Sequence, residues 1–250
     1  MPRKKMKLTE ENYYSQQANV KYWSVSQYKS FLACEAATMA QLRGGYTPPV
    51  SKAMLVGSFV DHHVEGTLQE FINEHPEIYT KKNLLRAEYR KANEIIKIID
   101  SDKDFNKFLS GEKQKILSFE MFGVLWKIKI DSFVEGICID DLKVVAKIDR
   151  YIINYLYDIQ GAVYQAGVEA NGYGRLPFYL SVISKENPPR KKVIQIRQER
   201  LDMRLNEIGE NMPHLIDVKN GLVEPKWCGK CPYCAMKQKT QIIDYESLIG

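Results

Sequence analysis

Two carboxylates and a lysine near the middle of the chain have the types and spacing needed for hydrolytic chemistry. Asp131 closes the run Trp-Lys-Ile-Lys-Ile-Asp, and Asp141 and Lys143 follow in the run Ile-Cys-Ile-Asp-Asp-Leu-Lys. Residues two apart on a strand share a face, so Asp141 and Lys143 point into one space, which Asp131 on the neighbouring strand can reach. Such a set suits a hard divalent ion and an activated water. An ordinary charged surface hairpin is the alternative, and it would be favoured for an isolated Asp-x-Lys.

The elements that must position these residues form an α/β pattern. The hydrophobic periodicity predicts a helix beginning near Ser24. Further helices are predicted at about 52–73, 84–101, 151–172 and 193–218. Strands are predicted at about 115–122, 124–131, 137–145 and 178–184. This order predicts a mixed central sheet with helices on its faces.

A second acidic pair lies on the predicted helix 52–73. Asp61 and Glu65 are four residues apart and therefore neighbour each other on one helix face. Like charges at this spacing are mildly unfavourable unless a cation lies nearby, although a solvated helix face is the simpler interpretation. His62 and His63 are adjacent, so at most one of them is expected to face the same site.

A polar pair follows the hairpin on the predicted helix 151–172. Gln160 and Tyr164 again share one helix face. Such a pair can orient a lysine and bind a phosphate or sugar edge. Taken alone, the pair would more often be incidental.

The cysteines indicate a metal site. Cys228, Cys231 and Cys234 form a C-x2-C-x2-C run, which favours metal over disulfides in a cytosolic protein. A closed site needs four ligands, so we expect Cys34 to lie beside this run, and Cys138 to be a buried small hydrophobe in the hairpin strand. The pattern does not choose between zinc and an iron–sulfur cluster. Three reduced thiols in a loop are the alternative.

The composition sets the broad class. The chain has 250 residues, 44% of them hydrophobic, and a net charge of +5, which is compatible with a polyanionic partner. No apolar run approaches the length of a membrane span, and we therefore expect a cytoplasmic protein without a membrane partner. We expect one domain over 1–250, with a core of about 50–220 and a cysteine-metal lobe formed by about 20–45 and 222–240.

The order of these motifs resembles the PD-(D/E)xK nuclease superfamily with its RecB-type Gln-x3-Tyr helix. The residues that carry the resemblance are, in chain order, Gly57, Asp61, Asp131, Asp141, Lys143, Gln160 and Tyr164. The segments 8–15 and 24–31 resemble one branch in particular, the phage-encoded exonuclease family similar to the nuclease domain of RecE. The likeness runs from about Leu8 to Cys234.

The resemblance implies a restriction-endonuclease-like core that cuts DNA with Mg²⁺ or Mn²⁺. It implies that Asp131 and Asp141 bind the metal with the Leu142 carbonyl, and that Lys143 orients or deprotonates the attacking water. Gln160 and Tyr164 match the motif that positions the lysine and the DNA backbone. Many relatives carry His where this chain has Asp61, which can still bind the metal directly or through water. Glu65, which neighbours Asp61 on the same helix face, is a further expected metal ligand.

The resemblance also bears on the cysteines, the partners and the biological role. Similar helicase-nucleases place one Cys before the nuclease core and three after it around a 4Fe–4S cluster, which matches Cys34 with Cys228, Cys231 and Cys234; Zn²⁺ is the alternative. The implied activity is exonuclease digestion of linear DNA in phage-type recombination or repair. A single-strand annealing protein and further copies of the chain are candidate partners. The rival readings are a non-catalytic DNA-binding or recombination-accessory module and a zinc-ribbon-type interaction protein.

Overall fold

The chain divides into two compact units. A computed structural model describes residues 6–49, 51–240, 242–244 and 246. The first unit comprises residues 1–25 and 49–212, and the second comprises 26–48 and 213–250. All of the acidic, Gln and Tyr candidates therefore fall in the first unit, and the four expected cysteine ligands fall in the second.

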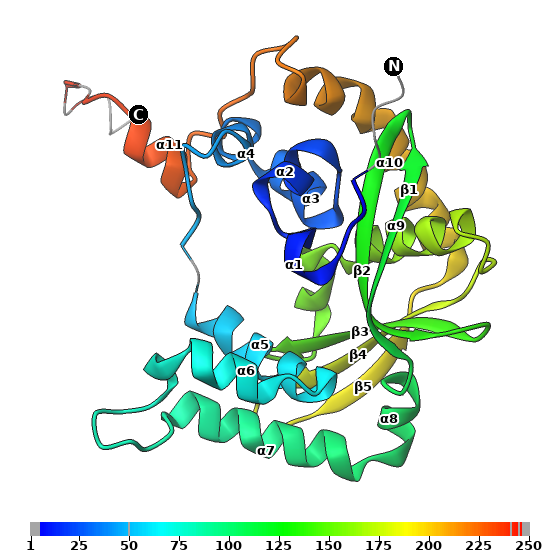
Figure 1. Ribbon diagram of the computed structural model, residues 1–250. Helices are drawn as coiled ribbons and strands as arrows, with labels where there is room; N and C mark the ends of the chain where they lie inside the picture. Colours follow the sequence, from blue (N-terminus) through cyan, green and yellow to red (C-terminus); the bar gives the residue numbers. More distant parts are fainter. Residues whose placement is uncertain (1–5, 50, 241, 245, 247–250) are drawn as a thin grey trace. The chain divides into compact units, whose positions relative to one another are not determined.

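A five-stranded mixed sheet forms the centre of the first unit (Figure 1). Its strands lie side by side in chain order, namely β1 (Glu112–Met121), β2 (Val124–Val134), β3 (Cys138–Val145), β4 (Phe178–Ser184) and β5 (Lys191–Gln195). Neighbouring strands pair antiparallel except β3 and β4, which are parallel. A parallel pair needs a crossover connection. That connection is made by the 3₁₀ helix η2 (Arg150–Tyr155) and the helix α9 (Tyr157–Ala170).

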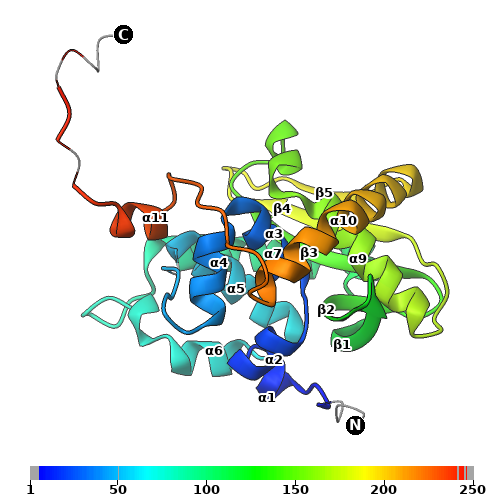
Figure 2. The ribbon, with the colours of Figure 1, turned by 90° about the horizontal axis from the view of Figure 1, so that it is seen from above.

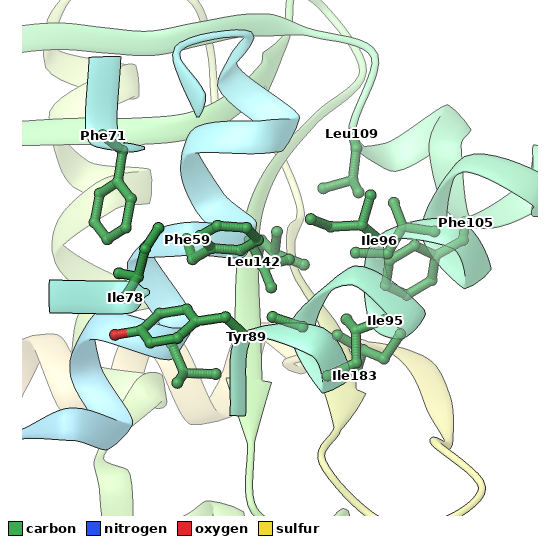
Figure 3. Close-up of a cluster of buried hydrophobic side chains, with 14 residues drawn as sticks. Phe59, Phe71, Ile78, Tyr89, Ile95, Ile96, Phe105, Leu109, Leu142 and Ile183 are labelled. Atoms are coloured by element: carbon green, nitrogen blue, oxygen red, sulfur yellow. The ribbon is translucent and has the colours of Figure 1, made fainter. Parts of the chain in front are cut away.

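One face of the sheet is covered by helices that precede it in the chain (Figure 3). These are α5 (Lys52–Glu65), α6 (Leu68–Glu74), the 3₁₀ helix η1 (Pro76–Ile78), α7 (Ala87–Ser101) and α8 (Lys103–Phe108). Phe59 of α5 and Ile95 of α7 join a buried cluster that includes Leu142 of β3 and Ile183 of β4. Since strand side chains alternate between faces, Asp141 and Lys143 point to the opposite face from Leu142.

The opposite face is covered by α9, which lies beside β2 in both ribbon views (Figures 1 and 2). Two glycines let this helix approach closely. A Cβ on Gly161 would lie 2.7 Å from Phe178 Cδ1, and one on Gly167 would lie 2.6 Å from Ile128 Cδ1. A side chain at either position would have to displace the facing side chains, so the two glycines allow α9 to lie close to the sheet.

The N-terminal segment of the first unit is anchored on β2. It contains α1 (Glu10–Tyr13) and α2 (Gln16–Lys21), and Trp23 forms a parallel β-bridge with Trp126. Lys127 is buried and donates hydrogen bonds to the Tyr13 carbonyl and, at 2.8 Å, to Asn19 Oδ1. Burial lowers the pKa of Lys127 to about 8. These contacts hold the segment against the face of β2 that also carries Asp131, since the two residues are four apart on the strand.

The second unit contains α4 (Glu35–Leu42), α11 (Pro232–Lys237), most of α3 (Val25–Ala33) and the end of α10 (Gln198–Lys219). Glu35 ties together segments that are distant in sequence. Its carboxylate lies 2.8 Å from His214 Nε2 and accepts a hydrogen bond from the Lys226 backbone N–H at 2.8 Å. These contacts fix the returning chain beside α4, where Cys34 stands immediately before the helix.

The structure corrects several predicted boundaries. The helix expected at about 52–73 is two helices, because Gly66 at φ +83° ends α5 directly after Glu65. The helix expected at about 151–172 begins with η2, and β2 continues past Asp131 to Val134. The predicted start of the last long helix near 193 is wrong, because residues 191–195 form the edge strand β5. Within the part of the chain described, no helix is both long enough and apolar enough to cross a membrane.

Candidate active site

Asp131 and Asp141 come together where the pairing of β2 and β3 ends. Ser132 opposite Asp140 is the pair at that end of the ladder. Asp131 Oδ2 accepts a hydrogen bond from the Leu142 backbone N–H at 3.1 Å, which fixes this carboxylate beside the next strand. Burial raises the pKa of Asp131 well above its ordinary value, and the negative charge of Asp141 raises it further. The two strands thus concentrate negative charge at one point of the sheet.

Lys143 supplies a positive charge beside Asp141 and Asp131. Its ammonium forms an ion pair with Asp141 Oδ2, which accepts no hydrogen bond from the other residues described. Burial opposes the charged form of Lys143, but Asp141 and Asp131 outweigh it and raise the pKa of the lysine above its usual value. The ammonium also lies 5.4 Å from the centre of the Tyr157 ring, within the range of a cation–π contact. Lys143 is therefore held as a cation at this site.

The helix α5 brings two further carboxylates to the same cluster. Burial raises the pKa of Asp61 to about 7; Lys143 opposes this shift, and Glu65 and Asp141 add to it. Asp61 Oδ1 is shielded from solvent, and no hydrogen-bond donor reaches it among the residues described. The effect of Glu65 on the pKa of Asp61 shows that the two carboxylates lie close together, as their spacing of four residues on one helix predicted.

Neither histidine of α5 contacts the carboxylates of β2 and β3. His62 Nδ1 lies 2.7 Å from Thr67 Oγ1 and 3.9 Å from Glu65 Oε2. His63 Nε2 lies 3.0 Å from Asp100 Oδ1, on the side of α5 that faces α7. The acidic members of this helix, rather than the histidines, face the candidate site.

Gln114 is a member of the site that the sequence did not suggest. It lies opposite Asp131 in the β1–β2 hairpin with its backbone at φ +52°, a left-handed conformation that is uncommon outside glycine. Its Nε2 donates to Glu65 Oε1 at 2.5 Å and to Asp131 Oδ1 at 3.4 Å. One amide group therefore bridges the carboxylates of two separate elements. A lone Gln in a strand gives no pattern from which this could be predicted.

The helix α9 contributes Gln160 and Tyr164, in different ways. Gln160 Nε2 donates to Asp141 Oδ1 at 2.5 Å. The Tyr164 hydroxyl instead donates to the Lys129 carbonyl at 2.8 Å, and its ring packs edge-on against Phe178. Burial raises the pKa of Tyr164 well above its ordinary value, so it stays a neutral donor. Gln160 contacts a carboxylate of the cluster, whereas Tyr164 contacts the backbone of β2 two residues before Asp131.

Asp140, next to Asp141, is a further buried acid. Its Oδ1 accepts a hydrogen bond from Ser181 Oγ at 3.0 Å. Burial raises its pKa to about 7, although the Ser181 hydrogen bond lowers it. Because neighbouring residues on a strand alternate between faces, Asp140 and Asp141 point in opposite directions. Asp140 therefore belongs to the packing of β3 with β4 rather than to the cluster around Lys143.

The second unit brings its four cysteines together. Cys34 Sγ lies 3.6 Å from Cys234 Sγ, which lies 3.8 Å from Cys228 Sγ, and all four sulfurs are within 4.8 Å of one another. Hydrogen bonds from the Lys230 and Cys231 backbone N–H groups lower the pKa of Cys228 to about 6. Cys138 lies apart in the sheet and is buried, as expected.

The two clusters differ in how tightly they are drawn together. Among the described residues, the cysteines are the one group of three or more His, Cys, Asp or Glu side chains whose ligand atoms all lie within 4.8 Å. The oxygens of Asp61, Asp131 and Asp141 do not all approach one another so closely. Carboxylates repel each other, and Mg²⁺ is commonly held by only one or two of them together with waters. The acidic cluster therefore suits a hydrated hard ion, and the thiol cluster suits a closed soft-ligand site.

Comparison with known proteins identifies the family of the chain and a similar crystal structure. The sequence pattern of the family described as "PDDEXK-like domain of unknown function (DUF3799)" matches residues 24–237. The chain belongs to this PDDEXK-like family. A crystal structure from Eubacterium rectale, named a "Putative exonuclease", is 40% identical, covers 98% of each chain and superposes with a TM-score of 0.94. The search of curated proteins gave no match. Membership of the PDDEXK-like family confirms the predicted superfamily and the mixed α/β fold class.

Proposed function

We propose that this PDDEXK-like protein is a DNA nuclease that hydrolyses phosphodiester bonds with the help of Mg²⁺ or Mn²⁺. The observation that carries the proposal is the convergence of Asp61, Asp131 and Asp141 around Lys143 from three separate elements. Four acids, counting Glu65, lie around Lys143, and the charge of Lys113 also interacts with Asp131 and Glu65, so the acids outnumber these two cations in a half-buried place. Such an arrangement is costly unless a further cation binds.

The donor set fits a hard divalent ion. Carboxylate oxygens are the ligands that Mg²⁺ and Mn²⁺ prefer, and Asp61 Oδ1 is a buried acceptor that no described donor reaches. Asp131 and Asp141 would hold the ion with the Leu142 carbonyl, and Asp61 would complete the set. When bound, the ion would polarise the scissile phosphate and lower the pKa of a coordinated water.

The remaining residues of the site would position these groups. Because its pKa is raised, Lys143 would act as a cation that orients the attacking water and offsets charge on the phosphate, rather than as a base. Gln160 would hold the orientation of Asp141, and Gln114 would keep Asp131 aligned with Glu65. Tyr164 would fix the backbone of β2 next to Asp131.

Exonuclease action on linear DNA is the finer part of the proposal. It is supported by the name of the 40% identical Eubacterium rectale structure and by the resemblance to phage-encoded exonucleases. A role in phage-type recombination or repair rests on that resemblance. Contacts to the DNA backbone would carry most of the affinity, so binding should weaken with salt and show little sequence preference.

The test is digestion of a linear duplex and a covalently closed circle of the same sequence, with Mg²⁺, Mn²⁺ or EDTA. We expect the protein to digest the linear duplex but not the closed circle, and only when a divalent metal is present. Digestion by Asp141→Ala should be at least about 100-fold slower. Asp104→Ala is the matched control, because Asp104 is an exposed acid of α8 that pairs only with Lys107 at the surface. Unchanged digestion by the Asp141→Ala protein would refute the assignment, and DNA binding without any digestion would support the non-catalytic accessory module.

We also propose that the four cysteines hold a structural metal. Tetrahedral Zn–S bonds of about 2.3 Å place neighbouring sulfurs about 3.8 Å apart. The Cys34–Cys234 and Cys228–Cys234 distances of 3.6 and 3.8 Å match this spacing. In a 4Fe–4S cluster each sulfur binds a different iron, which requires the sulfurs to stand further apart. The spacing therefore favours a single ion such as Zn²⁺ over the cluster that the resemblance implied.

Metal analysis of the purified protein tests this second proposal. One zinc per chain and no visible absorbance are expected, and Cys34→Ser should lower the zinc content and the thermal stability. Cys138→Ala is the matched control, since Cys138 lies in the sheet away from the four sulfurs. Four irons per chain with a brown colour would show that the cluster reading is right, and equal zinc content in Cys34→Ser and the unmodified protein would show that Cys34 is not a ligand.

A further inference from the structure

A cavity of about 450 Å³ opens in the first unit next to the acidic cluster. It is lined by η2, β4, β5 and the first turns of α9 and α10. Its size falls in the range of small-ligand sites, which are clefts of about 300–1,000 Å³. None of the residues so far assigned a role in hydrolysis lines it.

The floor of the cavity continues the row of side chains to which Asp141 belongs. Asp141 is paired with Leu180 in the β3–β4 ladder, and Leu180 is paired with Ile194 in the β4–β5 ladder. Paired residues on neighbouring strands point to the same face, and strands are about 4.8 Å apart. Leu180 and Ile194, which both line the cavity, are therefore the first and second neighbours of Asp141 across the sheet.

One wall of the cavity reaches the catalytic candidates directly. Tyr157 lines the cavity, and its ring centre lies 5.4 Å from Lys143 Nζ. Gln160, which binds Asp141, is three residues further along α9 and therefore lies on the same side of the helix. Tyr157 thus lies between the cavity, which it lines, and Lys143 of the cluster.

The cavity is apolar inside, and two arginines and the carboxylate of Asp158 lie among its lining residues. Ile153 contributes an aliphatic side chain that is 65% exposed. Arg197 and Arg200, at the start of α10, also line the cavity. Arg200 is held by Asp158, which lies 2.6 Å from the guanidinium and also accepts a hydrogen bond from Arg204 at 2.8 Å. An arginine fixed in this way is oriented for phosphate contacts.

We propose that this cavity binds the nucleobase next to the scissile phosphate of the strand being cut. The inference rests on the proposed nuclease function, because it assumes that a phosphate lies at Asp141 and Lys143. The face of a base is flat and packs on aliphatic and aromatic side chains, so it fits against Leu180, Ile194 and Ile153. It can also contact the Tyr157 ring, which stacks on Tyr155 with 5.6 Å between ring centres. Arg197 and Arg200 would contact the backbone of the same strand. Since stacking accepts every base, the cavity would position the strand without selecting a sequence.

Short duplexes with an abasic site at each of the two nucleotides that flank the terminal scissile bond test the proposal. For the unmodified protein, we expect the abasic site at one of these positions to raise KM about 10-fold over the intact duplex. Tyr157→Ala and Ile153→Ser should bind the intact duplex more weakly and should lose this preference for an intact base. Leu84→Ser is the matched control, because Leu84 is 61% exposed in the loop before α7, is not a cavity residue, and should keep the preference.

A binding assay separates failure of this inference from failure of the proposed function. The same duplexes carry 2-aminopurine at the tested position, and its fluorescence is measured on addition of the protein in Ca²⁺ without any requirement for cleavage. Quenching that is lost in Tyr157→Ala supports the cavity even if the protein never cuts DNA. Equal KM for intact and abasic duplexes, or a preference that persists in both variants, would overturn the cavity while leaving the nuclease proposal in place. Absence of DNA binding would overturn both.

Discussion

Replacing Asp61 with Asn should stabilise the metal-free protein at alkaline pH. Burial raises the pKa of Asp61 to about 7, against the opposing effect of Lys143 and with the added effect of Glu65. The folded protein therefore binds the proton more tightly than the unfolded chain, whose aspartates titrate near 3.8. As the pH rises from about 4 to about 7, the unfolded chain loses this proton first, and the free energy of unfolding falls. Above about pH 7 the folded protein carries the full cost of the charge, which Asn removes.

The size of the effect follows from the shift in the pKa. Three pKa units correspond to about 4 kcal/mol of lost stability, which is the largest gain that Asp61→Asn could give. The shift already includes the attraction of Lys143, and relaxation of the site around the buried charge makes the expected gain smaller, about 1–2 kcal/mol. For a chain of this length, 1 kcal/mol corresponds to about 2–4 °C in Tm. The expected rise is therefore about 2–8 °C at pH 8 and about a third of that at pH 5, because only the first part of the fall in stability between about pH 4 and pH 7 has then occurred.

Divalent metal should remove the difference in Tm by which Asp61→Asn exceeds the unmodified protein. A ligand at 100 times its Kd stabilises the folded state by about 2.7 kcal/mol. Since Asp61 is a proposed ligand, Mg²⁺ should raise the Tm of the unmodified protein by about 5–10 °C and that of Asp61→Asn by much less. The variant would thus be the more stable protein in EDTA and lose that advantage in Mg²⁺.

Thermal unfolding followed by circular dichroism gives the Tm of each protein under four conditions, at pH 5 and pH 8 and in EDTA and Mg²⁺. Asp104→Asn is the control, because this acid is exposed and its removal should leave every Tm unchanged. A Tm of Asp61→Asn that equals that of the unmodified protein in EDTA at pH 8 would refute the reasoning. So would a stabilisation at pH 5 as large as the one at pH 8, since the effect would then not come from the buried charge.

Three further substitutions test the residues that position the site. Gln114→Ala should raise the Mg²⁺ concentration for half-maximal activity about 5-fold, with kcat at saturating Mg²⁺ little changed, because the amide aligns Asp131 rather than contacting substrate; an unchanged metal titration would speak against this. Gln160→Ala should lower kcat, because Asp141 loses a hydrogen bond, and the Tm should stay within a few degrees; full activity would show that the contact is incidental. Tyr164→Phe should lower the free energy of unfolding by about 1 kcal/mol in a denaturant titration, since a buried hydrogen bond to the β2 backbone is lost, and no change would show that water replaces it.

Some features of this protein are determined by its local sequence. A strand presents alternate residues to one face, so the spacing of Asp141 and Lys143 was enough to place them together. A helix presents residues four apart to one face, which predicted the neighbouring positions of Asp61 and Glu65 in the same way. The C-x2-C-x2-C run brings three thiols together within a few residues of chain. In each case the geometry of one element decides the contact, and the sequence contains that geometry.

Other predictions failed because a local pattern can be read in two ways. The apolar residues near 193 continued the pattern of the following helix, but they form β5, whose partner β4 is supplied by tertiary pairing. The positive φ of Gly66 divides a helical pattern that would otherwise continue to residue 74. Both errors arise where the periodicity is compatible with two structures and packing selects one of them.

The assembly of the site was decided by the tertiary structure alone. Gln114 of β1 reaches Glu65 of α5 and Asp131 of β2, a relation among three elements that no spacing in the sequence expresses. The choice of Asp61 and Glu65 over His62 and His63 depends on which face of α5 meets the sheet. The number of ligands in a closed site predicted a fourth cysteine. Only the fold, however, brings Cys34 to the sulfur of Cys234, two hundred residues away. Contacts within one element follow from backbone geometry, whereas contacts between elements depend on how the whole chain buries its apolar surface.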